Sequence, residues 1–98
     1  MENKLTLARK KISEVDRKIA ELFEERMRAS EDVADYKRKC GLPIEDPVRE
    51  DELIKKNSLL VPEDIRPYYI GFQKDIMKAS KAYQRKLIEG EKIAYCGE

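Results

Sequence analysis

The first forty residues contain a long apolar stripe with a helical period. No proline or glycine occurs between positions 4 and 39, and apolar side chains recur there every seven residues in two rows. The rows consist of Leu5, Ile12, Ile19 and Val33, and of Ala8, Val15, Leu22, Ala29 and Tyr36. This pattern predicts one helix more than about 50 Å long, at a rise of about 1.5 Å per residue. A small globular monomer cannot cover this apolar seam, so we expect it to pack on other helices of the chain and on a second subunit.

Two shorter helices are expected after the long one. Gly41 follows three basic residues, an arrangement typical of a helix C-terminus with a left-handed cap. Asp46 and Pro47 predict the N-cap and first residue of a second helix, which runs to about position 57. A third helix is expected to begin between positions 62 and 67 and to reach about position 88, with Gly90 ending it. The expected fold is all-α, with one long, one short and one medium helix in an intertwined helical homodimer.

The composition argues against several classes of function. The 98 residues suffice for one compact domain, and 21 basic against 20 acidic residues give a net charge of only +1, so no nucleic-acid partner is expected. The N-terminal segment lacks an apolar signal core and no apolar run is long enough to cross a bilayer, so we expect a cytoplasmic protein without a membrane partner. Cys40 and Cys96 are far apart and the chain has no histidine, which removes the commonest general base. No metal and no cofactor is expected.

Arg26 is the anomaly in the seam, because it occupies a position of the first row where an apolar residue is expected. A buried cation needs an anionic partner, since desolvating it alone costs on the order of several kcal/mol. Either a protein carboxylate or an anionic ligand can neutralise it, and position alone leaves both open. Lys37 follows 11 residues later on nearly the same face. The two side chains are then about 16 Å apart along the axis and can lean toward one small anion.

Other polar groups stand where apolar ones are expected. Ser80 and Gln84 continue the four-residue row of Phe72 and Ile76, where they replace the end of an apolar stripe. Both can donate hydrogen bonds to a ligand, although either can instead satisfy the backbone or a neighbouring side chain. The segment Asp46-Pro47-Val48-Arg49-Glu50 places backbone N–H groups at a helix start, with an acid one turn in. Capping and a solvated ion pair also explain that segment.

In this order and spacing, these residues resemble the all-helical chorismate mutases over residues 4–88. The resemblance rests on Leu7-Ala8-Arg9-Lys10-Lys11-Ile12 with Asp16, Glu25-Arg26, Lys37, Asp46-Pro47-Val48-Arg49-Glu50, and the pair Ser80 and Gln84. That family rearranges chorismate to prephenate, in phenylalanine and tyrosine biosynthesis, by an intramolecular Claisen rearrangement without cofactor or covalent intermediate. The resemblance thus implies a chorismate mutase domain at residues 1–89.

The resemblance assigns the two substrate carboxylates to Arg26 and to Arg9 of the other subunit. Geometry agrees with two chains, because the two arginines are 17 residues apart in the sequence. On one straight helix they would lie about 25 Å apart along the axis and point in directions about 100° apart. They cannot clamp one small molecule in cis. Two long helices that run antiparallel across a two-fold axis would bring them together and form two equivalent sites.

The remaining matching residues take the chemical roles that the resemblance implies. Lys37 and Gln84 would donate to the ether oxygen as negative charge develops there. Glu50 would accept a hydrogen bond from the ring hydroxyl, assisted by the backbone around Asp46 and Arg49, and Ser80 would help to hold a carboxylate.

Residues 90–98 are expected to form a poorly ordered, non-helical tail. Lys92-Ile93-Ala94-Tyr95 and Gly97 are similar to the opening strand and loop of a prephenate dehydratase domain. The chain is then either the mutase part of a bifunctional protein or ends in a frayed natural terminus.

Two rival functions stay open at this point. One is a non-enzymatic helical dimerisation module, in which Arg26 pairs with an acid such as Asp16 or Glu50. The other is a nucleic-acid-binding hairpin. The sequence also does not distinguish chorismate from a related dianion such as isochorismate.

Overall fold

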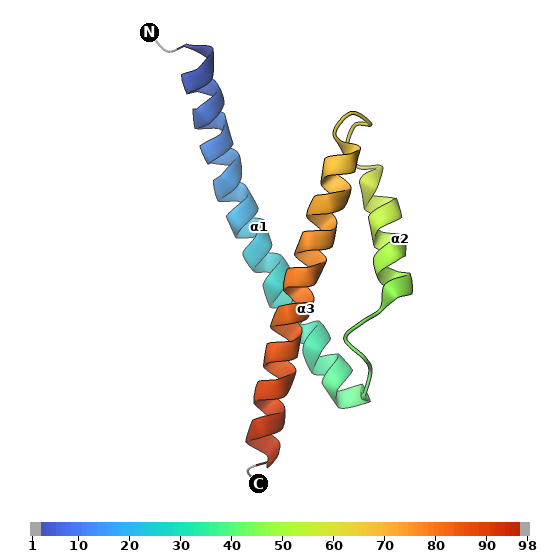
Figure 1. Ribbon diagram of the computed structural model, residues 1–98. Coiled ribbons are helices and arrows are strands. Elements are labelled where there is room, and N and C mark those ends of the chain that lie inside the picture. Colours follow the sequence, from blue (N-terminus) through green and yellow to red (C-terminus); the bar gives the residue numbers. More distant parts are fainter. Residues whose placement is uncertain (1–2, 97–98) are drawn as a thin grey trace.

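The protein consists of three helices joined by two short connections. The computed structural model describes residues 3–96 and, of these, the side chains of residues 3–90. The helices are α1 (Lys4–Cys40), α2 (Pro47–Ser58) and α3 (Arg66–Cys96). In Figure 1, α1 and α3 cross, while α2 lies beside the first half of α3. Contacts between helices join α3 to both of the others, so α3 is the central element. The expected all-α fold with one long and one short helix is confirmed for the residues that the structure describes.

Side chains cap the starts of α1 and α2. The Asn3 Oδ1 atom accepts a hydrogen bond of 2.9 Å from the Thr6 amide, which satisfies one of the free N–H groups at the start of α1. At α2, the Asp46 carboxylate accepts from the Arg49 amide at 3.2 Å, and Pro47 is the first helical residue. Both predictions for Asp46 and Pro47 are confirmed, and α2 ends one residue later than expected.

Gly41 ends α1 in the predicted left-handed conformation, with φ 66° and ψ 29°. The following amide, that of Leu42, donates to the Lys37 carbonyl at 2.8 Å and closes the last turn. Glycine adopts this conformation without the steric cost that a Cβ atom brings. The chain therefore leaves α1 one turn after Lys37 and turns back toward α2.

The predicted end of the third helix is wrong. α3 starts at Arg66, inside the expected window, but continues through Gly90 to Cys96. A glycine inside a helix costs only about 1 kcal/mol relative to alanine, and good helix formers such as Glu89, Glu91 and Lys92 flank it. Gly90 does not adopt the positive φ of a C-terminal cap. The non-helical tail and the opening strand expected after residue 90 are thus helical as far as residue 96, and residues 97 and 98 lie outside the described part.

The connection between α2 and α3 is fixed by polar contacts. The Arg66 guanidinium donates to the carbonyls of Ser58 at 2.8 Å and Val61 at 3.0 Å. The Gln73 amide donates to the Ser58 hydroxyl at 3.1 Å, and both side chains are buried. These bonds hold α2 against α3 at the end distant from the linker 41–46.

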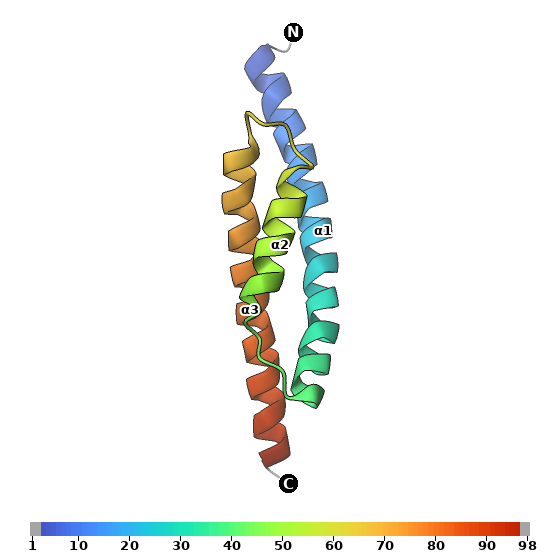
Figure 2. The same ribbon diagram turned by 90° about the vertical axis from the view of Figure 1, so that its right-hand side faces the viewer.

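The chain by itself leaves its apolar seam open to solvent. The molecule is elongated, with extents of 65 × 29 × 14 Å, and the first half of α1 extends away from the other helices (Figures 1 and 2). Ile12, Leu22 and Tyr36 remain 58%, 62% and 63% exposed. Among the described residues, the buried apolar side chains are those of Ala34 and Met77. No described helix contains an apolar stretch long enough to cross a membrane.

Candidate active site

A cavity of about 480 Å³, lined by both charged and apolar side chains, lies between the second half of α1, the start of α2 and the middle of α3. This volume is within the usual range for small-molecule sites, about 300–1,000 Å³. The cavity brings together every predicted site residue except Arg9. It is lined by Arg26, Ala29, Ser30, Val33, Lys37, Ile44, Asp46, Arg49, Glu50, Leu53, Met77, Ser80, Lys81 and Gln84.

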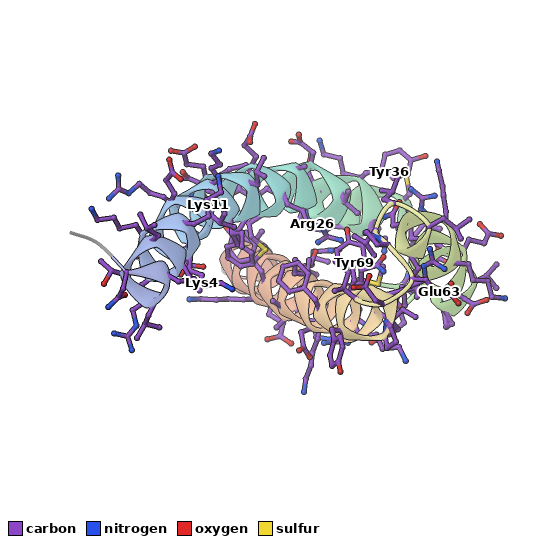
Figure 3. The ribbon with its side chains drawn as sticks, turned by 90° about the horizontal axis from the view of Figure 1, so that it is seen from above. Lys4, Lys11, Arg26, Tyr36, Glu63 and Tyr69 are labelled. Carbon is purple, nitrogen blue, oxygen red and sulfur yellow. The ribbon has the colours of Figure 1, made fainter. Side chains whose placement is uncertain are left out.

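Arg26 supplies a half-buried cation to this cavity. Figure 3 shows Arg26 on the side of α1 that faces α3. Among the described ion pairs, none involves its guanidinium, although Arg28 two residues later pairs with both Glu24 and Glu31. Glu50 does not neutralise Arg26, because its carboxylate lies 2.8 Å from the ammonium of Lys81 instead. The described residues thus leave the Arg26 charge available for an anion in the cavity.

Lys37 supplies the second half-buried cation and is held by the linker 41–46. Its Nζ atom donates to the Ile44 carbonyl at 2.8 Å. An ammonium group has three protons, so this bond leaves two for a ligand. The bond also fixes the direction of a long side chain that would otherwise sample many rotamers.

Three buried polar side chains form a chain of hydrogen bonds on the cavity wall. Ser30, Ser80 and Gln84 are each only 6% exposed. The Ser30 hydroxyl donates to the Arg26 carbonyl at 3.1 Å and lies 2.7 Å from the Ser80 hydroxyl, to which the Gln84 amide donates at 3.2 Å. The single Ser30 proton goes to the carbonyl, so Ser80 must donate to Ser30. Gln84 keeps one free N–H, and its Oε1 atom has no partner among the described groups.

Lys81 joins the acids on either side of Asp46. Its Nζ atom lies 2.8 Å from Glu50 Oε1 and 2.9 Å from Glu45 Oε2, and Glu45 also pairs with Arg85. The hydrogen bond to Glu50, followed by that to Glu45, raises the pKa of Lys81 above its usual value. The hydrogen bond from Lys81 in turn is the main cause of a lowered pKa of Glu45. The start of α2 is therefore fixed to α3 by charge.

Arg9 lies outside the cavity, in the first third of α1. It belongs to a shallow basic hollow on the helix surface, together with Thr6, Lys10, Ser13, Glu14 and Arg17. Arg9 and Arg26 stay apart within one chain, as expected for two residues 17 positions apart on one straight helix. The expected contribution of Arg9 to the site of a second subunit stays a prediction.

Ser30 and Lys81 are site residues that the sequence interpretation missed. Ser30 stands four residues after Arg26, on the same face of α1, so a search for polar neighbours of Arg26 at helical spacing could have found it. Lys81 gave no such signal, because an isolated lysine on α3 resembles any solvated charge. The Ile44 carbonyl was also not predictable, since a backbone group carries no mark in the sequence.

A family model described as chorismate mutase type II matches residues 8–85 of the chain. The chain belongs to the type II chorismate mutases. A chorismate mutase from Methanocaldococcus jannaschii is 36% identical over 91 residues, which make up 91% of this chain and 92% of that protein. No solved structure matches the chain significantly.

The matched range of this mutase contains every predicted site residue, from Arg9 to Gln84. The resemblance to the chorismate mutases over most of the chain is confirmed, and with it the prediction of an isomerase. A non-enzymatic dimerisation module is not favoured, because the ion pair that it expects between Arg26 and an acid such as Asp16 or Glu50 is absent among the described residues, and Glu50 pairs with Lys81.

Proposed function

We propose that this chorismate mutase works as a homodimer with two equivalent sites, each of which rearranges chorismate to prephenate in the cavity of one subunit with Arg9 of the other. The observation that carries the proposal is the unneutralised charge of Arg26 beside Lys37, Glu50 and Gln84 in one hollow. Chorismate is a dianion that must fold into a compact chair-like conformer before it reacts. Paired cations can restrict it to that geometry without forming any covalent bond.

The interaction of Lys37 with the substrate strengthens most during the reaction. The ether oxygen of chorismate gains negative charge while its carbon–oxygen bond breaks and the new carbon–carbon bond forms. A fixed ammonium beside this oxygen therefore stabilises the transition state more than the ground state. The Ile44 carbonyl holds Lys37 in place and leaves two protons for this purpose.

Gln84 is the second donor to the ether oxygen, through the N–H that Ser80 does not use. Its amide is neutral at any pH, so it adds a dipole without changing the charge of the site. Ser80 can donate its proton to a substrate carboxylate only when it no longer donates that proton to Ser30. This requires the Ser30 hydroxyl to turn from the Arg26 carbonyl toward Ser80, which their 2.7 Å separation permits.

Glu50 is the acceptor for the ring hydroxyl of chorismate. It lies in the first turn of α2, where Asp46 and Arg49 line the same cavity and the Asp46 carboxylate accepts from the Arg49 amide. A carboxylate and a hydroxyl form a short, strong hydrogen bond. This contact depends on the position of the hydroxyl group on the ring. It therefore favours chorismate over isochorismate, in which the hydroxyl is attached elsewhere.

An exposed apolar hollow and the distant position of Arg9 support the homodimer. Leu22 and Phe23 of α1 and Phe72 of α3 border an apolar hollow of about 350 Å³ and are 62%, 41% and 44% exposed. A second long helix laid antiparallel across this hollow would bury these side chains. It would also carry Arg9 toward Arg26 of the other subunit, which an isolated chain cannot do.

An ultraviolet assay of chorismate loss, together with the molar mass in solution, tests the proposal. Arg9→Ala and Arg26→Ala are each expected to be nearly inactive alone. After subunit exchange in an equal mixture, half of the dimers are mixed and each has one intact site, so about a quarter of the wild-type activity should return. If mixing restores nothing although the subunits exchange, Arg9 does not act across the interface. A folded dimer without any activity on chorismate would contradict the function itself.

Two finer expectations stay predictions. The cytoplasmic location calls for localisation of the protein in its own cells. The fusion to a prephenate dehydratase domain, expected from residues 92–97, would be tested by the natural reading frame, and the helical course of residues 91–96 gives it no support.

A further inference from the structure

Lys81 makes an ion pair that differs from the surface pairs of this chain. The side chains of Lys81 and Glu50 are only 22% and 23% exposed, whereas those of Lys55 and Asp51 are 77% and 63% exposed. A pair in this position is less screened by water and salt than one on an open helix face. Lys81 also has two acids within 3 Å, because Glu45 lies 2.9 Å from the same ammonium.

The pair forms part of the cavity wall. Glu50, Met77 and Lys81 line the active-site cavity and also a second hollow of about 300 Å³ between α2 and α3. The second hollow is lined further by Pro47, Asp51, Ile54 and Lys74. With Lys81 removed, the Glu50 side chain would lose its only described charged partner and could turn from one hollow to the other.

Charge gives a second reason for a cation at this place. A dianionic substrate would bind beside the Glu50 carboxylate, and like charges at close range repel each other. The Lys81 ammonium compensates the carboxylate and reduces this repulsion. Because its two hydrogen bonds to carboxylates raise the pKa of Lys81, this compensation persists throughout the neutral range.

We propose that Lys81 is a positioning residue of the rearrangement, which holds the Glu50 carboxylate in place for the ring hydroxyl and, through Glu45, fixes the linker 41–46. The linker contains the Ile44 carbonyl that holds Lys37, so the contacts to the ring hydroxyl and to the ether oxygen both depend on the same ammonium. The proposal rests on the proposed role of Glu50. Lys81 itself need not touch the substrate.

The test is a double-mutant cycle in kcat/KM for chorismate. Lys81→Met is expected to lower kcat/KM by about tenfold to a hundredfold, since a small misplacement of a contacting group has effects of this size. Because Lys81 acts in part through Glu50, adding Lys81→Met to Glu50→Gln should lower kcat/KM by a clearly smaller factor than Lys81→Met does in the wild type. Lys81→Arg, which keeps the charge, should restore most of the activity. Lys81→Gln serves in the cycle if the methionine variant does not fold.

Arg85→Met is the matched control, because it removes the other cation on Glu45 without touching Glu50. Its kcat/KM should stay within about threefold of wild type. The proposal is overturned if Lys81→Met keeps wild-type activity, if the losses from the Lys81 and Glu50 variants simply multiply, or if Arg85→Met loses as much. The wild-type chain is assayed first, and only its failure to consume chorismate would contradict the function rather than the role of Lys81.

Discussion

The Ser30 and Ser80 hydroxyls lie 2.7 Å apart on facing helices, and both side chains are buried. This contact joins α1 to α3 at the active-site wall and connects the backbone of Arg26 to the amide of Gln84. A buried hydroxyl that loses its partner costs about 1–3 kcal/mol. The orientation of two groups that face the substrate therefore depends on Ser30, a small residue beside the apolar seam of α1.

Ser30→Ala is expected to lower the free energy of unfolding by about 1–2 kcal/mol and kcat/KM severalfold, because Ser80 loses the acceptor for its proton. Ser58→Ala is the matched control, since Ser58 is also buried and bonded to Gln73 but lies away from the cavity. The control should lose stability and keep its activity. Denaturant unfolding and the chorismate assay measure the two effects separately. Equal activity losses in both variants would show that Ser30 acts only through stability.

Lys37→Ala is expected to lower kcat by about two to three decades, the usual effect of removing a donor to a developing oxyanion. Lys39→Ala is the control on the same turn of α1, where the ammonium is exposed and pairs with Asp35. That variant should remain fully active. A change in KM alone for Lys37→Ala would mean that the lysine binds substrate and transition state equally and has no differential role.

Gly41→Ala and Gly90→Ala should change stability in opposite directions. Gly41 has a φ of 66°, which alanine adopts at a cost of about 1 kcal/mol, although an added Cβ would meet no atom within 4 Å. Gly90 is helical, and alanine there should stabilise the fold by up to about 1 kcal/mol. Thermal unfolding of the two variants measures both effects. A stabilising Gly41→Ala would contradict the left-handed cap.

Glu31→Gln should reduce the sensitivity of the fold to acid. The hydrogen bond from Tyr83, followed by that from Arg28, lowers the pKa of Glu31 below its usual 4.5. A carboxylate with a lowered pKa stabilises the folded state above the unfolded pKa, and this contribution is lost as the pH falls through the folded value. The difference in unfolding free energy between wild type and variant should thus be largest near neutral pH and shrink below about pH 4.5.

Glu24→Gln is the control for this acid titration, because Glu24 pairs with the same Arg28 from a longer distance of 3.6 Å. Its stability should follow that of the wild type as the pH falls. Denaturant unfolding at a series of pH values measures the comparison. A constant difference between wild type and Glu31→Gln down to pH 3 would contradict the assigned cause of the pKa shift.

The sequence by itself determined the helices and most of the site. A heptad of apolar residues, a glycine after three basic residues, and an Asp-Pro pair are local signals, so the ends of α1 and the start of α2 could be read directly. Arg26 was recognisable because it breaks a regular pattern. Gly90 misled the interpretation, since a glycine permits a helix end without requiring one, and its neighbours favour the helix.

Only the tertiary structure decided how the polar groups pair. Lys81 with Glu50 and Ser30 with Ser80 join residues that are 31 and 50 positions apart, and no local rule predicts such partners. The packing of α3 against α1 and α2 sets these contacts, because it fixes which faces of the helices meet. It also leaves the Arg26 charge open to the cavity, which neither the composition nor the spacing of the residues could determine.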